Sequence, residues 1–561
     1  MCFHPAFTQL TTSRSPSEPY LGCVSSEMRI REAEKCGMAQ QMPEDAVGRR
    51  VSCDGERGTV RYVGTVPPTT GLWLGVEWDN PERGKHDGSH EGVRYFTCRH
   101  PTGGSFVRPK KASFGVDLLT AVGLRYEMCL DQAIGEEVKI STKTVKMIGF
   151  ESIMEKQRME NLTEIALINC EVSGPGPENE IKKNTPNAVS LDLSGNLLSS
   201  WEVVAAVTEQ LEELQVLCLS HNQLSITSSP SSLSHAFARI KVLTLNNCAI
   251  TWSQVLHCAP MWPNVEELFL NDNDISELQR PVDVLQGLKV LDLSNNGLVQ
   301  ESLPQIYNLY RLEMLNLSST GLSTIHFSDT LPGNKTAMFP ALKILLLDDN
   351  KITEWGVINE LDKLRTLVQL SCKRNPLMDL EKNRETTRQL LIARIGQLEI
   401  VNRSQVLQEE RRGAELDYCK KFGRAWLQAG GHSDPEKNHP SAEFIAEHPR
   451  YLTLIQKYGA PEEDELKEQK PFALKDQLLT ITFECPEDTD RKPIQKKLPS
   501  SMMVQKVKGL LYRLLKLPGA ELRLSYTSSK IEGKEVEIHN DLKPLQFYSI
   551  EDGDRILVRW F

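Results

Sequence analysis

Leucines recur along the middle of the chain in the pattern L-x-x-L-x-L-x-x-N. The pattern is complete in three windows, which end at Asn222, Asn296 and Asn350. Weaker copies end at six further anchor positions, Cys170, Asn196, Cys248, Asn273, Thr320 and Asn375. Neighbouring anchors are 23 to 30 residues apart, and most intervals fall within the period of about 20 to 29 residues that is typical of one class of solenoid. The pattern therefore predicts about nine stacked units, each with one short strand.

Each predicted unit is too small to be stable alone. No single unit can bury its leucines, so stacked neighbours must share one continuous core. The asparagine at the end of a unit can hydrogen-bond the backbone that is left unpaired at the turn. We expect leucine-rich repeats over residues 159–400 and a helical cap over residues 401–430. The x position of each L-x-L strand faces outward on the concave side, and the candidate contacts with a partner are Asp192, Cys218, Phe269, Asp292, Asn316 and Leu346.

In the segment before the repeats, apolar and polar side chains alternate with the two-residue period of β-strands. Residues 50–54 and 58–64 alternate apolar and polar side chains, and Pro67-Pro68 and Asp79-Asn80-Pro81 mark turns. We therefore expect a small all-β domain over residues 43–115. Residues 1–42 are rich in Ser, Thr, Pro and Glu and have no periodicity, which predicts a disordered tail. Residues 116–158 are expected to form a connector.

The end of the chain mixes strand and helix patterns. Residues 504–515 carry apolar side chains at helical spacing, and strands are expected at 478–483, 522–526 and 555–560. This order resembles the ubiquitin-like β-grasp fold, so we expect an α+β domain over residues 473–561. A linker with one or two short helices is expected over residues 431–472. The sequence ends in Trp560-Phe561 without Gly-Gly, so we do not expect conjugation of the ubiquitin kind.

Composition narrows the class of protein. The 561 residues suffice for about three or four domains. A net charge of −10 argues against nucleic acid as a general partner. No apolar run approaches the roughly 20 residues that span a bilayer, and the first residues do not resemble a signal peptide. The thirteen cysteines are scattered without a C-x-x-C pair, which favours reduced thiols. We expect a cytoplasmic protein that does not bind a membrane.

Basic charge gathers around one glycine-rich loop in this acidic chain. Residues 79–111 carry seven basic and four acidic side chains, a local charge of +3. The loop Gly84-Lys85-His86-Asp87-Gly88 lies in this segment, and aromatic residues flank it on both sides. Such a surface is suited to an acidic peptide with an aromatic end.

The loop and its flanks resemble a CAP-Gly domain, the β-rich module that binds acidic-aromatic tails such as that of α-tubulin. The resemblance implies that Lys85 pairs with a tail carboxylate and that Gly84, Asp87 and Gly88 shape the loop. It also implies that aromatic side chains line a groove and that a basic side chain adds charge nearby. Those residues are Trp73, Phe96, Phe106 and Arg108. The familiar loop has Asn where this chain has His86, which can still donate one hydrogen bond.

The three modules in this order resemble the family of tubulin-folding cofactor E, also called tubulin-specific chaperone E. The resemblance implies a chaperone that binds the tail and the globular body of α-tubulin. It also implies that the chaperone works with other tubulin cofactors to assemble the α/β heterodimer, and that it can dissociate dimers. We expect a monomer that is associated with the cytoskeleton.

No catalytic constellation is recognisable, so we do not expect an enzyme or a bound cofactor. His86 and His90 lie in a glycine-rich loop without a helical pattern, so a metal site is not expected. Two other functions remain open at this point. One is a microtubule plus-end adaptor, although such a protein would favour tandem CAP-Gly domains or long coiled coils. The other is a ubiquitin-pathway adaptor that brings tubulin clients to the proteasome.

Overall fold

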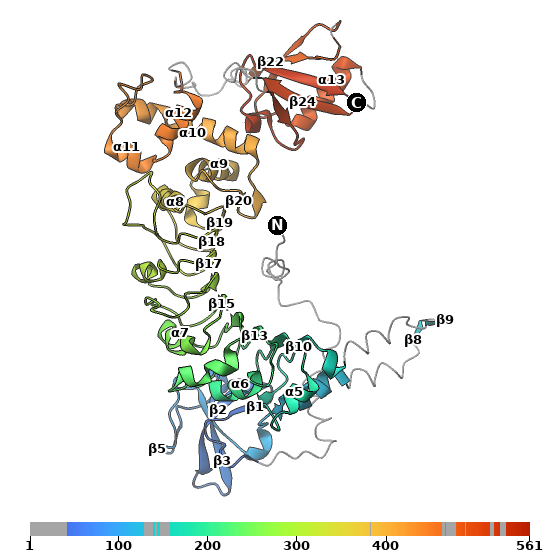
Figure 1. Cartoon of the computed structure of the whole chain (residues 1–561), viewed down its shortest axis with the longest axis vertical. Coiled ribbons are helices and arrows are strands. Elements are labelled where there is room, and N and C mark those ends of the chain that lie inside the picture. The colour runs from blue at the N-terminus through green and yellow to red at the C-terminus, as the bar shows by residue number, and fades with distance from the viewer. Residues whose placement is uncertain are drawn as a thin grey trace. The chain divides into compact units, whose positions relative to one another are not determined.

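The computed structural model describes residues 42–127, 158–381, 383–462, 466, 478–488, 490–516, 521–527 and 535–560 (Figure 1). It also describes the backbone of two short strands, β8 (Val138–Ile140) and β9 (Lys143–Val145). The predicted tail before residue 42, most of the predicted connector and the end of the predicted linker lie outside the described residues. The chain divides into two compact units, residues 1–228 and 229–561, and each is described by itself.

The N-terminal β domain is a four-stranded antiparallel sheet in the order β1-β2-β3-β6. The strands are β1 (Arg50–Cys53), β2 (Glu56–Thr65), β3 (Leu72–Trp78) and β6 (Gly104–Val107). A hairpin of β4 (Ser89–His90) and β5 (Val93–Arg94) lies between β3 and β6 in the chain. Alternate strand residues form the core, among them Val51, Val60, Leu74 and Val76. The all-β fold that the alternation predicts is confirmed.

The first repeats complete the N-terminal unit. Their strands are β10 (Glu164–Ala166), β12 (Ser190–Asp192) and β13 (Val216–Cys218), which pair in parallel. Ile165, Leu191 and Leu217 stand in register and are buried, as the repeat pattern requires. Two helices, α5 (Glu180–Asn184) and α6 (Trp201–Thr208), lie in the segments that connect the strands.

The C-terminal unit contains its own series of parallel strands, which lie side by side in Figure 1. They are β14 (Val242–Thr244), β15 (Glu267–Phe269), β16 (Val290–Asp292), β17 (Met314–Asn316), β18 (Ile344–Leu346), β19 (Gln369–Ser371) and β20 (Ile400–Val401), followed by the antiparallel β21 (Ser404–Gln405). The connecting segments include α7 (Trp252–Cys258) and α8 (Trp355–Asp362). Each predicted anchor lies four residues beyond a strand, as Asn296 does beyond Asp292. The predicted solenoid fold is confirmed.

The segment after the β domain differs from the expected connector. Residues 116–117 form strand β7 (Val116–Asp117), which pairs in parallel with β11 (Val172–Gly174) next to the first repeat. Helix α2 (Leu118–Val122) follows, and its Leu118 and Val122 are fully buried. Short apolar runs of this kind form stable structure only when a neighbouring element covers them. Here the contacts with the first repeats supply that cover.

A helical cap follows the repeats and extends further than expected. It contains α9 (Arg384–Arg394), α10 (Gln408–Gln428), α11 (Ala442–Glu447) and α12 (Tyr451–Tyr458). The last two helices lie in the expected linker, yet Tyr451 and Leu454 of α12 are fully buried. Apolar side chains three residues apart share one face of a helix, and the Tyr451 hydroxyl donates to the Cys419 carbonyl of α10 over 2.8 Å. Residues 442–458 are therefore part of the cap.

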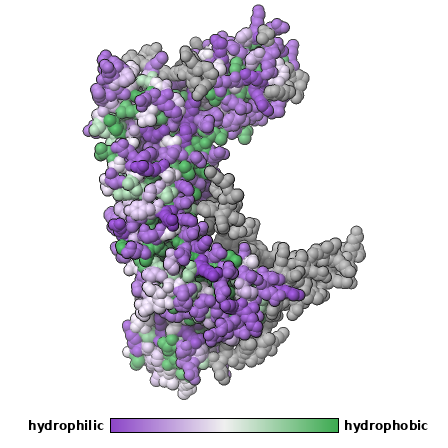
Figure 2. All heavy atoms as spheres, in the orientation of Figure 1, coloured by the Kyte–Doolittle hydropathy of each residue, from purple (hydrophilic) through white to green (hydrophobic). Residues whose placement is uncertain are grey.

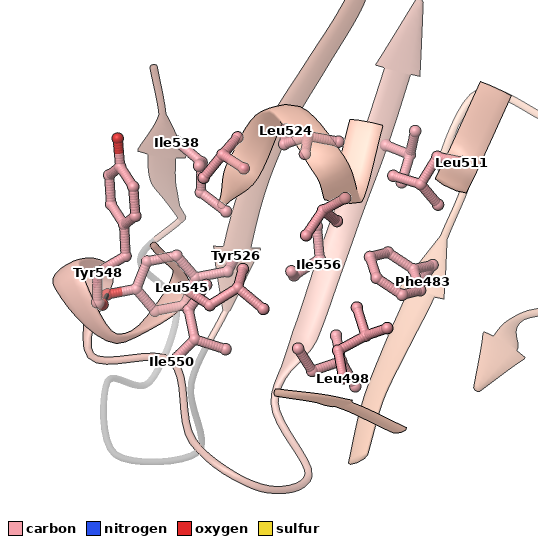
Figure 3. Close-up of a cluster of buried hydrophobic side chains, with 14 of the residues drawn as sticks. Phe483, Leu498, Leu511, Leu524, Tyr526, Ile538, Leu545, Tyr548, Ile550 and Ile556 are labelled. Atoms are coloured by element: carbon pink, nitrogen blue, oxygen red, sulfur yellow. Dashed lines mark hydrogen bonds between the residues drawn. The ribbon is translucent and has the colours of Figure 1, made fainter. Parts of the chain in front are cut away.

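The last domain has the β-grasp order that the sequence predicts. Strands β22 (Leu478–Glu484), β23 (Ile494–Pro499), β24 (Leu522–Thr527), β25 (Val536–Ile538) and β26 (Arg555–Trp560) form one sheet in the order β23-β22-β26-β24-β25. Helix α13 (Val504–Leu515) and the 3-10 helix η11 (Leu545–Tyr548) pack on it. Figure 3 shows Leu511, Phe483 and Ile556 pointing into the shared core.

The described surface is largely hydrophilic. In the face shown in Figure 2, apolar residues are scattered in small groups between polar ones. Among the described residues, no helix is both long enough and apolar enough to cross a membrane.

Candidate peptide-binding groove

The glycine loop of the β domain is fixed to strand β6. The backbone N–H groups of Lys85 and His86 both donate to the Gly104 carbonyl, over 2.7 and 3.2 Å, and the Gly104 N–H donates to the His86 carbonyl over 2.7 Å. Glycine is required at both ends of the loop. A Cβ at position 84 would lie 1.9 Å from the Thr102 carbonyl oxygen, and Gly88 has a φ of +99°. The loop therefore has one defined conformation.

Phe106 lies at the centre of a cluster of aromatic rings. Its ring centroid is 4.9 Å from that of His86, 5.4 Å from that of Tyr95 and 5.5 Å from that of Phe96. Tyr62 and His90 complete the cluster at 6.4 and 6.2 Å. Phe106 is half-buried, so the cluster presents part of an aromatic surface to solvent. Such a surface can accept an aromatic side chain in edge-to-face geometry.

Phe96 supports this surface from behind. Its side chain is 7% exposed, and its ring packs where Gly75 and Gly104 leave space, since a Cβ at these positions would lie 2.4 and 3.1 Å from ring atoms. Gly75 stands between Tyr62 and Phe106 in the strand register. The structure thus places the predicted groove residue Phe96 beneath the groove.

Trp73 and Arg108 form a stacked pair at the edge of the β domain. The guanidinium carbon of Arg108 lies 3.7 Å from the centre of the Trp73 ring. The same guanidinium donates to the carbonyls of Thr70 and Leu72 over 2.9 and 3.2 Å, while Trp73 Nε1 donates to Thr69 Oγ1 over 2.7 Å. Trp78, in contrast, is 3% exposed and belongs to the core of the β domain.

The charged residues of the loop have different roles. Asp87 accepts a hydrogen bond from the Ser89 N–H over 3.1 Å and pairs with Arg94 over 2.8 Å. Hydrogen bonds from Ser89 lower the pKa of Asp87, so its carboxylate stays ionised and shapes the loop. Lys85 is exposed, and no acidic side chain in the described part of the chain forms an ion pair with it. Its ammonium group is available to an external carboxylate.

The substituted loop residue, His86, has a defined tautomer. The Gly88 N–H donates to His86 Nδ1 over 3.0 Å, so in the neutral ring the proton is on Nε2. Burial lowers the pKa of His86, although the charge of Asp87 opposes this effect. At neutral pH the side chain therefore offers one N–H donor, as an asparagine amide would.

Tyr62 and Tyr95 also belong to the aromatic cluster, although the sequence does not predict them as groove residues. Their ring centroids are 5.2 Å apart, and both contact Phe106. The sequence signal at Tyr95 is its position next to Phe96 and close to the loop. For Tyr62, only the pairing of β2 with β3 shows that it lies opposite Gly75.

The polar side chains at the predicted outward positions of the repeats form hydrogen bonds. In the C-terminal unit, Phe269, Asp292 and Asn316 stand in one register row. Asn316 Nδ2 donates to Asp292 Oδ2 over 2.9 Å, and Phe269 is 7% exposed. In the N-terminal unit, half-buried Asp192 accepts from the Ser194 N–H over 2.8 Å. Of these four positions, Asp192, Asp292 and Asn316 keep a partly exposed polar side chain. Their role in binding stays a prediction.

No group of three or more His, Cys, Asp or Glu side chains that could hold a metal ion occurs among the residues that the structure describes.

Comparisons with known protein families match each of the three modules. The family description "CAP-Gly domain" matches residues 47–112, "Leucine Rich Repeat" matches residues 287–309, and "Ubiquitin-like domain" matches residues 479–559. The chain is thus a multidomain protein that combines a CAP-Gly domain, leucine-rich repeats and a ubiquitin-like domain.

Relatives that align with nearly the whole chain identify the family. Tubulin-specific chaperone E of Danio rerio is 70% identical over 92% of this chain and 100% of its own length. The Homo sapiens protein of the same name is 53% identical over 93% of this chain and 100% of its own length. The solution structure of the C-terminal ubiquitin-like domain of mouse tubulin-specific chaperone E is 60% identical, over 15% of this chain and 88% of that one, with a TM-score of 0.15. This chain belongs to the tubulin-specific chaperone E family and is a tubulin chaperone.

Proposed function

We propose that the CAP-Gly groove binds the acidic-aromatic tail of α-tubulin. The observation that carries this proposal is the aromatic surface around Phe106 beside the exposed Lys85, which forms no ion pair with any residue that the structure describes. A terminal aromatic ring packs on that surface, and a carboxylate of the tail forms a charge-assisted hydrogen bond with Lys85. His86 Nε2–H donates a second hydrogen bond.

The repeats and the ubiquitin-like domain bind the rest of the client in this proposal. The outward positions Asp192, Asp292 and Asn316 offer polar groups for the globular body of α-tubulin, and Phe269 stands in the register row of Asp292 and Asn316. The ubiquitin-like domain contacts another tubulin cofactor or tubulin itself. Several modest sites on one chain raise the overall affinity through effective concentration. Binding at several points also supports assembly of the α/β heterodimer and dissociation of existing dimers without catalysis by this chain.

The test is to incubate the purified chain with tubulin dimers and separate the products on a native gel. We expect a complex with α-tubulin alone. Lys85→Ala should weaken binding of a synthetic acidic peptide with an aromatic end by at least about tenfold, since a charge-assisted hydrogen bond contributes about 1.5 to 3 kcal/mol. Lys110→Ala is the matched control, because Lys110 is also exposed and lies in the same domain but outside the loop.

Other products would favour the alternative functions. Dimers or polymer that stay intact on the chain would favour a microtubule adaptor. Capture of proteasomes by the full chain, with no α-tubulin complex, would favour a ubiquitin-pathway adaptor. Equal peptide affinity for the Lys85→Ala variant and the wild type would contradict the proposed groove.

A further inference from the structure

The CAP-Gly domain is joined to the first repeats without a flexible linker. Ser113 is held to strand β1 by two backbone hydrogen bonds with Ser52, of 2.8 and 2.9 Å. Val116, three residues later, is already held to the repeats, because its N–H donates to the Glu171 carbonyl over 2.9 Å. Phe114, which lies between them, is 6% exposed and packs in the CAP-Gly core. Gly115 lies between these residues, and its N–H donates to Ser113 Oγ over 3.3 Å.

Side chains tie the two parts together at separate places. Ser113 Oγ donates to Glu171 Oε2 over 2.7 Å, beside the junction. Arg57 of strand β2 donates to Asn169 Oδ1 over 3.2 Å. Arg99 donates to the side-chain oxygen of Gln223. Contacts from three different segments of one domain fix its orientation, since rotation about any one contact breaks the other two.

The backbone conformation at position 115 and its close contact with the repeats both require glycine. Its φ is +80°, and a Cβ there would lie 2.2 Å from the Glu171 carbonyl oxygen. Glycines between domains are often hinges. Gly115 instead allows the backbone of one domain to approach the backbone of the other more closely than any other residue could.

We propose that the CAP-Gly domain and the first three repeats form one rigid body, with Gly115 as its positioning residue. The groove and the outward positions Asp192 and Cys218 are then presented in a fixed relative orientation. The partner that fits such a surface carries an acidic, aromatic-ended tail at a fixed place on a folded body. This inference rests on the proposed function for the identity of the tail site.

The rigid junction raises the affinity for the whole partner without altering the groove or the outward positions of the repeats. Binding of the tail brings the body of the partner to the repeats at a high effective concentration, which is greatest when the connection matches the span between the sites. A junction that is already ordered also loses little conformational entropy on binding. Opening the junction should therefore weaken binding of the whole partner and leave binding of an isolated tail unchanged.

The test compares two glycine variants in the full chain. Gly115→Ala and Gly55→Ala place the same side chain at φ values of +80° and +82°, but nothing lies within 4 Å of a Cβ at position 55. Backbone strain is thus matched, and only Gly115→Ala collides with the repeats. Hydrogen exchange at residues 113–117 and 171–174 reports the state of the junction. Titrations with a synthetic acidic-aromatic peptide and with tubulin dimers report the two kinds of binding.

We expect faster exchange at both segments in Gly115→Ala, an unchanged peptide affinity, and at least about tenfold weaker binding of tubulin. Gly55→Ala should behave as the wild type in all three measurements. The double variant Ser113→Ala with Arg57→Ala removes two side-chain ties at positions whose φ is not positive. It should shift exchange and tubulin binding in the same direction as Gly115→Ala.

Two results would overturn the rigid-body proposal. One is unprotected exchange at residues 113–117 in the wild type. The other is wild-type affinity for tubulin in a variant whose junction exchanges freely. Failure of the proposed function has a different signature, because the wild type would then not bind the peptide while its junction remained protected.

Discussion

Asn296 is one of the buried side chains that hold neighbouring repeats together. It is 2% exposed, and its Nδ2 donates to the carbonyls of Leu270 and Leu293 over 3.0 and 2.9 Å. Its Oδ1 accepts from the N–H groups of Asn273 and Ile275 over 3.1 and 3.2 Å. One side chain thus satisfies backbone groups of two successive turns that no strand pairing reaches.

Replacing this side chain should destabilise the repeats. Asn296→Ala leaves several buried backbone groups without a partner, and we expect a loss of about 3 kcal/mol in the free energy of unfolding. Chemical denaturation measures this loss, and hydrogen exchange at residues 290–296 locates it.

The matched control is Asn316→Ala. Asn316 is half-buried, its Nδ2 donates to Asp292 Oδ2 over 2.9 Å and its Oδ1 accepts from the Ser318 N–H over 3.1 Å, and both partner residues are also half-buried. Both partners can bond water after the substitution, so the loss should be less than about 1 kcal/mol. Equal losses in the two variants would contradict the special role of the anchor asparagine.

At the scale of elements, the cap helices are joined through buried polar groups. Glu415 of α10 is 1% exposed and accepts hydrogen bonds from Arg450, Lys457 and Tyr458 over 2.9, 2.8 and 2.8 Å. Burial alone would raise the pKa of Glu415, but these hydrogen bonds outweigh it and the pKa is lowered. The carboxylate therefore stays ionised and connects α10 with α12.

His448 makes the cap sensitive to acid. Its ring is buried against Phe422, Phe444 and Tyr418, and the Tyr418 hydroxyl lies 2.7 Å from Nδ1. Burial, with a contribution from the charge of Arg394, lowers the pKa of His448 to about 3. Between this value and the ordinary histidine pKa of about 6.5, only the unfolded state takes up the proton. Stability should therefore fall as the pH falls through this range.

We expect the cap to lose about 1 kcal/mol of stability through His448 between about pH 7 and about pH 5.5. His448→Gln keeps a polar side chain at this position but does not titrate, so the comparison isolates His448 from other groups. The contribution of Glu415 is lost only at lower pH, below its ordinary pKa. Denaturant titrations at the two pH values measure the difference, and a pH dependence that His448→Gln leaves unchanged would contradict this assignment.

At the scale of the C-terminal unit, the ubiquitin-like domain packs on helix α10 of the cap. Arg412 donates to the Tyr526 hydroxyl over 2.6 Å, and Lys420 forms an ion pair with Glu551. Between these contacts, a Cβ at Gly413 would lie 2.8 Å from the Phe547 carbonyl oxygen. A glycine inside a long helix is locally unfavourable, and the approach of Phe547 explains its presence.

Gly413→Ala should stabilise helix α10 itself but weaken its contact with the ubiquitin-like domain. Alanine favours the helix by up to about 1 kcal/mol, yet the added methyl group should displace the ubiquitin-like domain. We expect faster hydrogen exchange at residues 545–551 and a helix content that does not fall. Gly509→Ala is the control, because Gly509 is also helical and nothing lies within 4 Å of its Cβ position. Unchanged exchange in Gly413→Ala would show that this contact does not hold the domain.

Local patterns accounted for most of the elements and for the outline of the groove. The strands of the β domain and the helix over residues 504–515 follow from periods of a few residues. The anchor positions follow from a motif that recurs every 23 to 30 residues. The Gly84–Gly88 loop is also a local motif. The place of Phe96 beneath the groove and the contacts of Tyr62 could not be predicted, because they depend on the pairing of β2, β3 and β6.

The sequence by itself determined the modules and their order, since each is specified by short-range periodicity or by a compact motif. Only the tertiary structure decided how modules are joined. Nothing in the sequence distinguishes Gly115 and Gly413 from other glycines. In the structure, each is required because the carbonyl group of a residue far along the chain lies against it. The same holds for the low pKa of His448, which follows from burial by side chains of other elements. Contacts between distant residues set these properties, and no local pattern encodes them.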